Sequence, residues 1–143
     1  MLAPVVSLLL FGMIDYGMTL NDAQAVRQAV REGARQAVVG DFPDCLSVSG
    51  LGRKTACEVE VRSNLDANRL LVKVSAPNGM TTGQSVLVCA YYPATSMTGI
   101  TKPFLAGKTF KSKIRMRVER KVGATTAAVT YQDVGWAGDS WCT

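Results

Sequence analysis

Four cysteines are the residues of this sequence whose chemistry is best constrained: Cys45, Cys57, Cys89 and Cys142. The chain has no histidine and no CxxC pair, so a zinc site would need four scattered thiolates. An even count in a small domain that follows an apolar N-terminal segment favours two disulfides and an oxidising, extracytoplasmic location. Four cysteines allow three pairings. In one of them Cys45 and Cys57 close a short loop, and Cys89 holds the C-terminal tail through Cys142.

Residue patterns that perform catalysis are missing from the sequence. Without a histidine, no imidazole can activate a cysteine thiol. There is no G-x-S-x-G motif, no Walker loop and no pair of carboxylates with an evident role. Asp41 and Asp44 share one loop, but two acids fall well short of an EF-hand pattern for calcium. We therefore expect a protein that is not an enzyme and that needs no cofactor or metal.

A cluster of positive charge lies in the C-terminal third of the sequence. Seven of the 16 Lys and Arg residues fall between Lys108 and Lys121, in a chain with a formal net charge of +5. Four of them share the outward face of an expected strand: Lys111, Lys113, Arg115 and Arg117. Such a strip could bind DNA or another anionic surface. No aromatic residues alternate with these cations to stack on bases, so the favoured interpretation is a solvated sheet face.

The elements that must position these residues begin with one long helix, expected over residues 1–40, followed by a β-rich head over residues 41–143. Residues 2–20 are almost wholly apolar, and residues 21–39 are amphipathic. A helix of about 39 residues extends about 58 Å, more than a domain of about a hundred residues can cover. The apolar half is therefore expected to protrude and to meet a bilayer, other copies of the chain, or each in turn.

Asp15 interrupts the apolar half and is the candidate functional residue of the helix. The uninterrupted run over residues 2–14 is shorter than the ~20 residues of a bilayer span. A carboxylate in hydrocarbon costs about 2.5–3.5 kcal/mol. Two interpretations are open: Asp15 pairs with a cation or N-terminus of a neighbouring copy, or it lies at the membrane–water boundary. The residues expected to contact neighbouring helices are Leu2, Pro4, Val5, Leu9, Phe11, Gly12, Ile14, Asp15 and Gly17.

The amphipathic half carries small or β-branched residues at helical spacing, which predicts packing against a sheet. These residues are Val26, Ala29, Val30, Gly33 and Ala37. Gly40 then ends the helix. Alternating patterns predict strands over residues 57–62, 70–76, 85–92 and 110–120, with one more over 125–131. Segments 41–55 and 92–107 are expected loops and 77–84 a turn, so the fold class is α+β with a small antiparallel sheet.

The segment LAPVVSLLLFGMIDYG at residues 2–17, followed by REGAR at residues 31–35, resembles the TadE-like family of pilin and pseudopilin proteins. That family belongs to the tight-adherence, type IVc branch of type IV pilus systems. The resemblance continues through residues 86–92, PFL at residues 103–105 and SKIRMRVE at residues 112–119. The four cysteines and the terminal pattern W-x-x-x-x-WC are similar to the actinobacterial members. Nearly the whole chain is covered.

The resemblance implies a type IV pilin-like fold and a prepilin in the inner membrane. A prepilin peptidase would cut this precursor, and an ATPase-driven assembly platform would extract it. Copies would then polymerise through residues 2–20 into an extracellular filament, with the disulfide-braced head as the outer surface. The alternative is a minor pseudopilin, or a membrane-anchored surface or adhesion module of a pilus or secretion assembly. Family members carry a glutamate and a cleavage-site glycine shortly before the LAP motif, and neither falls within the present residues.

Overall fold

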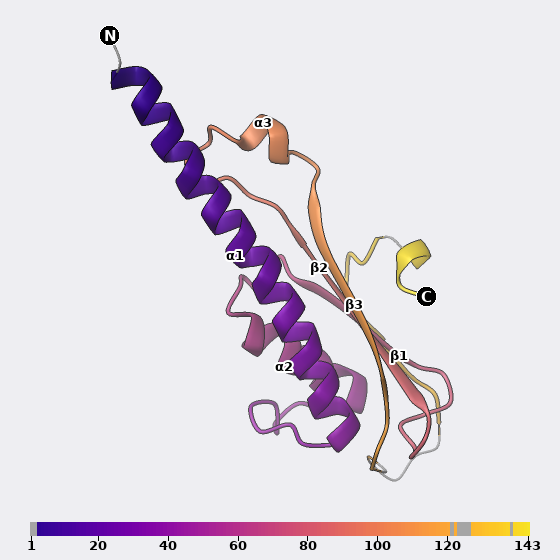
Figure 1. Ribbon diagram of the computed structural model, residues 1–143. Helices are drawn as coiled ribbons and strands as arrows, with labels where there is room; N and C mark the ends of the chain where they lie inside the picture. The colour runs from indigo at the N-terminus through magenta and orange to yellow at the C-terminus, as the bar shows by residue number, and fades with distance from the viewer. Residues whose placement is uncertain (1–2, 121, 123–126, 138) are drawn as a thin grey trace.

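The fold places one long helix beside a small antiparallel sheet (Figure 1). The computed structural model describes residues 3–120, 122, 127–137 and 139–143. In chain order the elements are α1 (Ala3–Val39), α2 (Leu51–Ser63), β1 (Leu71–Ala76), β2 (Ser85–Pro93), α3 (Lys102–Leu105), β3 (Thr109–Arg117), β4 (Val129–Gln132) and the 3-10 helix η1 (Asp139–Trp141). The α+β fold class predicted from the sequence is confirmed.

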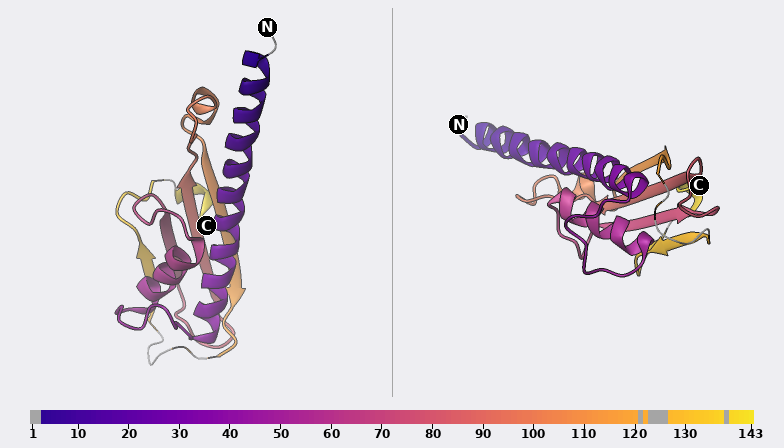
Figure 2. Two further views of the ribbon diagram at one scale, coloured as in Figure 1. Left: turned by 90° about the vertical axis from the view of Figure 1, so that its left-hand side faces the viewer. Right: turned by 90° about the horizontal axis from the view of Figure 1, so that it is seen from below.

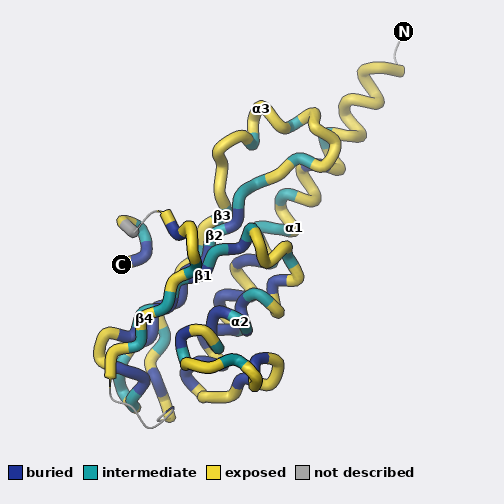
Figure 3. The backbone as a smooth tube through the Cα atoms, turned by 180° about the vertical axis from the view of Figure 1, so that it is seen from behind, coloured by how far each residue is buried: buried dark blue, intermediate teal, exposed yellow. Residues whose placement is uncertain are grey.

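α1 is a single uninterrupted helix of 37 residues. Its end has a physical cause, because Gly40 adopts a φ of 77° and its N–H donates to the Gln36 carbonyl at 2.8 Å. The second half of α1 lies against the sheet, whereas the first half extends beyond the head (Figures 1 and 2). Figure 3 shows the same division as a change from buried to exposed residues along the helix.

The four strands form one antiparallel sheet with the order β3-β2-β1-β4. On one face, α1 packs against β2 and β3, and α2 packs against β1 and β4 (Figure 2). Because alternate residues of a strand point to opposite faces, each central strand gives every second residue to the core under the helices. These residues are Val72, Val74, Ala76, Val86, Val88 and Ala90.

The opposite face of the sheet is covered by the C-terminal tail. A second buried cluster forms there from Leu87 and Cys89 of β2 together with Trp136 and Cys142 of the tail. The Trp136 and Trp141 rings lie with their centroids 5.7 Å apart. The tail therefore covers the face of the sheet that the helices leave open.

Both predicted disulfides are present: Cys45 is bonded to Cys57, and Cys89 to Cys142. This pairing is one of the three that the sequence allowed. The first bond joins the loop after α1 to α2, and the second joins the tail to β2.

The strand expected over residues 57–62 is wrong, because this segment belongs to α2. The alternation of CEVEVR suggested a strand, but Val59 is buried and Val61 is 52% exposed. The buried residues of α2 instead recur at helical spacing, and they include Gly52, Thr55, Ala56, Val59 and Ser63. The helix also shortens the expected loop over residues 41–55 and makes the head less β-rich than predicted.

The other predicted elements differ from the structure mainly at their ends. α3 forms one turn inside the expected loop over residues 92–107. β3 ends at Arg117 rather than at residue 120, and its inward residues are half-buried because it is an edge strand. β4 accounts for the last predicted strand from Val129 onward, whereas residues 125 and 126 lie outside the described residues.

Gly33 marks a close approach between α1 and α2, since a Cβ there would lie 2.4 Å from Cγ2 of Val59. We expect Gly33→Ala to destabilise the protein by about 1–3 kcal/mol, because the two helices must separate to admit a methyl group. Urea unfolding of the full chain in detergent would measure this change. Gly12→Ala is the control: a Cβ at Gly12 meets nothing within 4 Å. Equal stability of the two variants would contradict the packing described.

Removal of either disulfide should destabilise the head, and the longer closed segment should matter more. The sequence separations are 53 residues for Cys89–Cys142 and 12 residues for Cys45–Cys57. Chain entropy then predicts losses of about 4 and about 3 kcal/mol for the paired Cys→Ser variants. Thermal unfolding of the two variants beside the unsubstituted chain tests the order, and a larger loss for the shorter segment would refute it.

Candidate functional site

The apolar half of α1, residues 3–20, exposes most of its side chains. Residues 8–11 are four consecutive exposed residues, and successive helix residues point about 100° apart, so the exposed surface covers the whole circumference. By length and composition, α1 is a candidate to cross a membrane. The exposed large apolar residues of this half are Val5, Val6, Leu8, Leu9, Leu10, Phe11, Met13, Ile14, Tyr16, Met18 and Leu20.

Asp15 is the buried residue of this half, with 1% of its surface exposed. Three hydroxyl groups donate to its Oδ2 atom: Ser96 Oγ at 2.6 Å, Thr98 Oγ1 at 2.7 Å and Thr101 Oγ1 at 2.6 Å. The backbone N–H groups of Met97 and Thr98 donate to Oδ1 at 3.1 and 3.0 Å. Five donors therefore satisfy both carboxylate oxygens within the same chain.

The donors all belong to the loop between β2 and β3, residues 94–108, which we call the tip loop. It projects beyond the sheet toward the N-terminal end of α1 and contains α3 (Figures 1 and 2). Neither interpretation of Asp15 drawn from the sequence included a partner within the chain. The hydroxyl-rich run TSMTGIT at residues 95–101 is visible in the sequence. The contact of this run with Asp15 could not be predicted, because only the tertiary fold brings the two segments together.

Two glycines of the apolar half have no role in packing within the described chain. A Cβ at Gly12 or Gly17 would meet nothing within 4 Å. Glycine inside a helix costs about 1 kcal/mol relative to alanine, so these two positions weaken α1 without a visible gain inside the monomer. Gly33 differs, because Val59 of α2 packs directly against it. The sequence had suggested that a sheet would pack at this position.

The structure separates the two sets of helix residues that the sequence singled out. Of the expected assembly residues, Pro4, Val5, Leu9, Phe11, Ile14 and Gly17 are exposed, Gly12 is half-buried and Leu2 lies outside the described residues. The expected packing residues Val26, Ala29, Val30, Gly33 and Ala37 are all buried.

Cations of the predicted basic strip contact their own chain. Lys111 Nζ lies 5.7 Å from the centroid of the Trp141 ring, and Lys113 Nζ donates to the Thr143 carbonyl at 3.4 Å. Arg117 Nε donates to a carbonyl of the β1–β2 turn at 3.0 Å. The strip therefore faces the C-terminal tail and the turn. The contacts with the tail could not be predicted from the sequence, because they depend on how the second disulfide places the tail.

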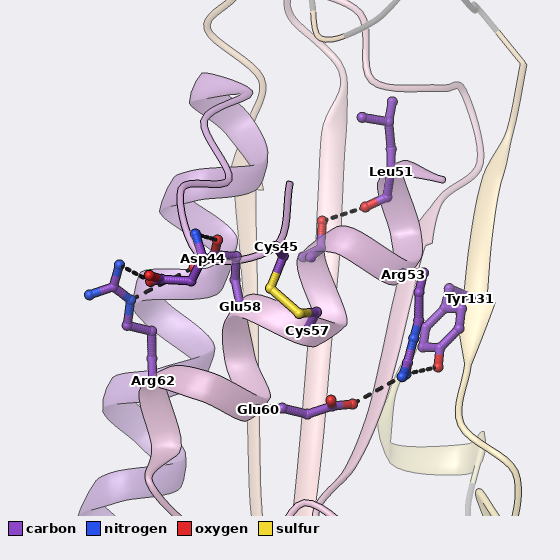
Figure 4. The surroundings of a disulfide bond; sticks show 10 residues. Asp44, Cys45, Leu51, Arg53, Cys57, Glu58, Glu60, Arg62 and Tyr131 are labelled. Atoms are coloured by element: carbon purple, nitrogen blue, oxygen red, sulfur yellow. Dashed lines mark hydrogen bonds and ion pairs between the residues drawn. A yellow bond between two sulfur atoms is a disulfide. The ribbon is translucent and has the colours of Figure 1, made fainter. Parts of the chain in front are cut away.

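A charged network surrounds the first disulfide (Figure 4). The buried Glu58 accepts a hydrogen bond from the Asp44 N–H at 3.1 Å, and Arg62 lies 2.7 Å from Asp44 Oδ2 and 3.7 Å from Glu58 Oε2. On the other side of α2, burial raises the pKa of the Glu60 carboxyl. The positive charge of Arg53, whose Nη1 lies 3.3 Å from Glu60 Oε1, partly offsets this rise. The contacts of Asp44 with Glu58 and Arg62 hold the loop after α1 against α2. In the part of the chain that the structure describes, no three potential metal ligands come together.

The head, the sheet and the protruding apolar helix together define an α+β fold that is consistent with a pilin-like protein. The family model described as TadE-like protein matches residues 1–35, which include the apolar half of α1 and Asp15. The match supports the TadE-like family and suggests a component associated with a Tad pilus. No curated protein and no solved structure matches the chain significantly.

Asp15→Asn should release the tip loop, because an amide in place of the carboxylate cannot accept from five donors. We expect amide hydrogen exchange in residues 94–106 to accelerate at least about tenfold, with the rest of the sheet unchanged. Glu32→Gln is the control, since Glu32 accepts hydrogen bonds from Arg35 on the same helix and does not touch the loop. Equal exchange in the two variants would show that Asp15 does not hold the loop.

Proposed function

We propose that this protein is a structural subunit of an extracellular, type IVc or Tad-like pilus filament, in which copies polymerise through residues 3–20. The observation that carries the proposal is the exposed apolar surface around the whole circumference of this helix half. A helix that is apolar on all sides is stable only inside lipid or among other helices. The family match over residues 1–35 covers this same segment.

The distribution of exposed residues favours many neighbours over one. A dimer would cover a single stripe of α1, whereas residues 8–11 point in four directions and are all exposed. Relative to exposure to water, burial of the remaining surface of the exposed large apolar residues contributes on the order of 30 kcal/mol per copy. One neighbour covers only a fraction of this surface, and that fraction is comparable with the cost of association, so a subunit gains most where several neighbours surround it.

Gly12 and Gly17 support close packing between helices in the filament. Within the chain nothing approaches the Cβ positions of these residues. Small residues let helix backbones approach each other closely, which is where interhelical contact in an apolar environment is strongest. The cost of glycine in α1 is then offset by contacts between copies.

Before assembly, the apolar half would hold the precursor in the inner membrane with the head outside. The partners implied at this stage are a prepilin peptidase and an assembly platform. The four cysteines, all in disulfides, and the W-x-x-x-x-WC ending support a place among the actinobacterial members of the family. The disulfides fit an oxidising location for the head.

A minor pseudopilin, or a membrane-anchored adhesion module, is the alternative function. Its apolar helix would need the same composition, because a single span and a filament core both require an apolar surface. The two functions differ in abundance: a major subunit forms most of the filament mass, and a minor subunit does not.

Electron microscopy of sheared cell-surface material, followed by mass spectrometry of the filaments, tests the proposal. Filaments composed mainly of this chain are the expected result, and the N-terminal peptide would identify the processed end. Filaments that contain only traces of the chain would favour the minor-subunit alternative. A chain that stays in the membrane fraction, with no filaments, would refute polymerisation.

Gly17→Leu should abolish or strongly reduce filaments while the head still folds. A Cβ at residue 17 meets nothing within 4 Å in the monomer, but a leucine side chain would occupy the space in which a neighbouring helix packs. Gln28→Leu is the matched control, because it adds the same side chain at an exposed position in the half of α1 that the head covers. Filament yield by microscopy and urea unfolding of each variant separate assembly from folding. Unchanged yield with Gly17→Leu would contradict close packing at residue 17.

A further inference from the structure

We propose that the tip loop is a second membrane-contacting element of the unassembled protein. It would insert into the headgroup region of the bilayer beside α1, with Met97 and Phe104 reaching the acyl chains. The proposal rests on the membrane-inserted state proposed above. It adds a lipid contact made by the head, whereas in the membrane-inserted state proposed above only the apolar half of α1 needs to contact lipid.

The depth of the loop is set by its attachment to α1. Three hydroxyls and two N–H groups join it to Asp15. The apolar surface of α1 continues past this level, since Tyr16 and Leu20 are 65% and 44% exposed. A bilayer that covers those two residues also reaches the level of Asp15 and thus the loop. Phe104 follows Thr101 by three residues, so it lies within about 11 Å of that attachment.

The surface of the loop has the composition of a membrane interface. Met97 and Phe104 are 74% and 79% exposed, and Ile100 is 39% exposed. Residues 94–108 include no aspartate or glutamate, whereas Lys102 and Lys108 are both exposed. Lysines beside exposed apolar side chains extend toward lipid phosphates while their methylene stems stay among the apolar groups.

Many backbone N–H groups of the loop are hydrogen-bonded within the protein. The N–H groups of Met97 and Thr98 donate to Asp15, and that of Gly99 donates to Ser96 Oγ at 2.8 Å. In and after α3, the N–H groups of residues 102, 104, 105 and 106 donate to carbonyls of residues 99, 101 and 102. Pro103 has no N–H to satisfy. Internal hydrogen bonds lower the cost of bringing irregular backbone near hydrocarbon, and the remaining backbone groups can bond to water in the headgroup region.

Photo-crosslinking of the full chain in vesicles of phosphatidylcholine and phosphatidylglycerol tests the proposal. The photoreactive residue p-benzoylphenylalanine would replace Phe104, Leu9 or Leu46 in three separate variants. Leu9 reports on the membrane-inserted helix. Leu46 is 74% exposed and belongs to the loop after α1, which lies at the opposite end of the molecule from the tip loop (Figure 1). It is the matched apolar control.

We expect lipid adducts at positions 9 and 104 in comparable yield, and about tenfold less at position 46. Adducts at position 9 without adducts at position 104 overturn the proposal for the loop and leave the membrane-inserted helix intact. Crosslinks from position 104 to a second copy, in place of lipid, also overturn it and assign the loop to contacts between subunits. Absence of lipid adducts at all three positions refutes both the loop contact and the membrane-inserted state.

Discussion

α1 is much longer than the head, and its length decides which of its residues the head can bury. The sheet and α2 bury its second half, so the head and this half of the helix share one core around Val30 and Val59. The head reaches the first half through the tip loop at Asp15, and most other side chains of that half remain exposed. Because α1 is continuous, whatever covers the first half also determines where the head lies. In the proposed membrane-inserted and assembled states, the head would therefore be held through a rigid helix rather than through a linker.

The hydrogen bonds to Asp15 compensate the cost of placing its carboxylate in an otherwise apolar half of the helix. A carboxylate in an apolar helix is costly unless donors accompany it, and here the donors come from the tip loop of the same chain. The residue is therefore polar without presenting a polar surface to lipid or to another subunit. The same contacts join the loop to the helix at a second place outside the shared core.

The sequence was sufficient for the elements whose patterns are local. α1, its end at Gly40, the two central strands and the turn between them follow from periodicity and from turn residues. α2 was missed because Val59 and Val61 suggested alternation, although only Val59 is buried. The partners of Asp15 and the contacts of Lys111 and Lys113 could not be predicted, since each depends on segments that only the tertiary fold brings together. The exposed apolar surface was predictable, because a helix that is much longer than its domain has to protrude.

The disulfides join cysteines that are consecutive along the chain. If the head emerges into an oxidising compartment in chain order behind the membrane-held helix, Cys45 and Cys57 appear before Cys89. The earliest bond available is then already the native one, and Cys89 finds Cys142 as the remaining free thiol. A wrong pairing would require a thiolate to attack a bond that has formed. In the proposed export of the head, the order in which the thiols appear would thus guide oxidative folding and place little demand on a disulfide isomerase.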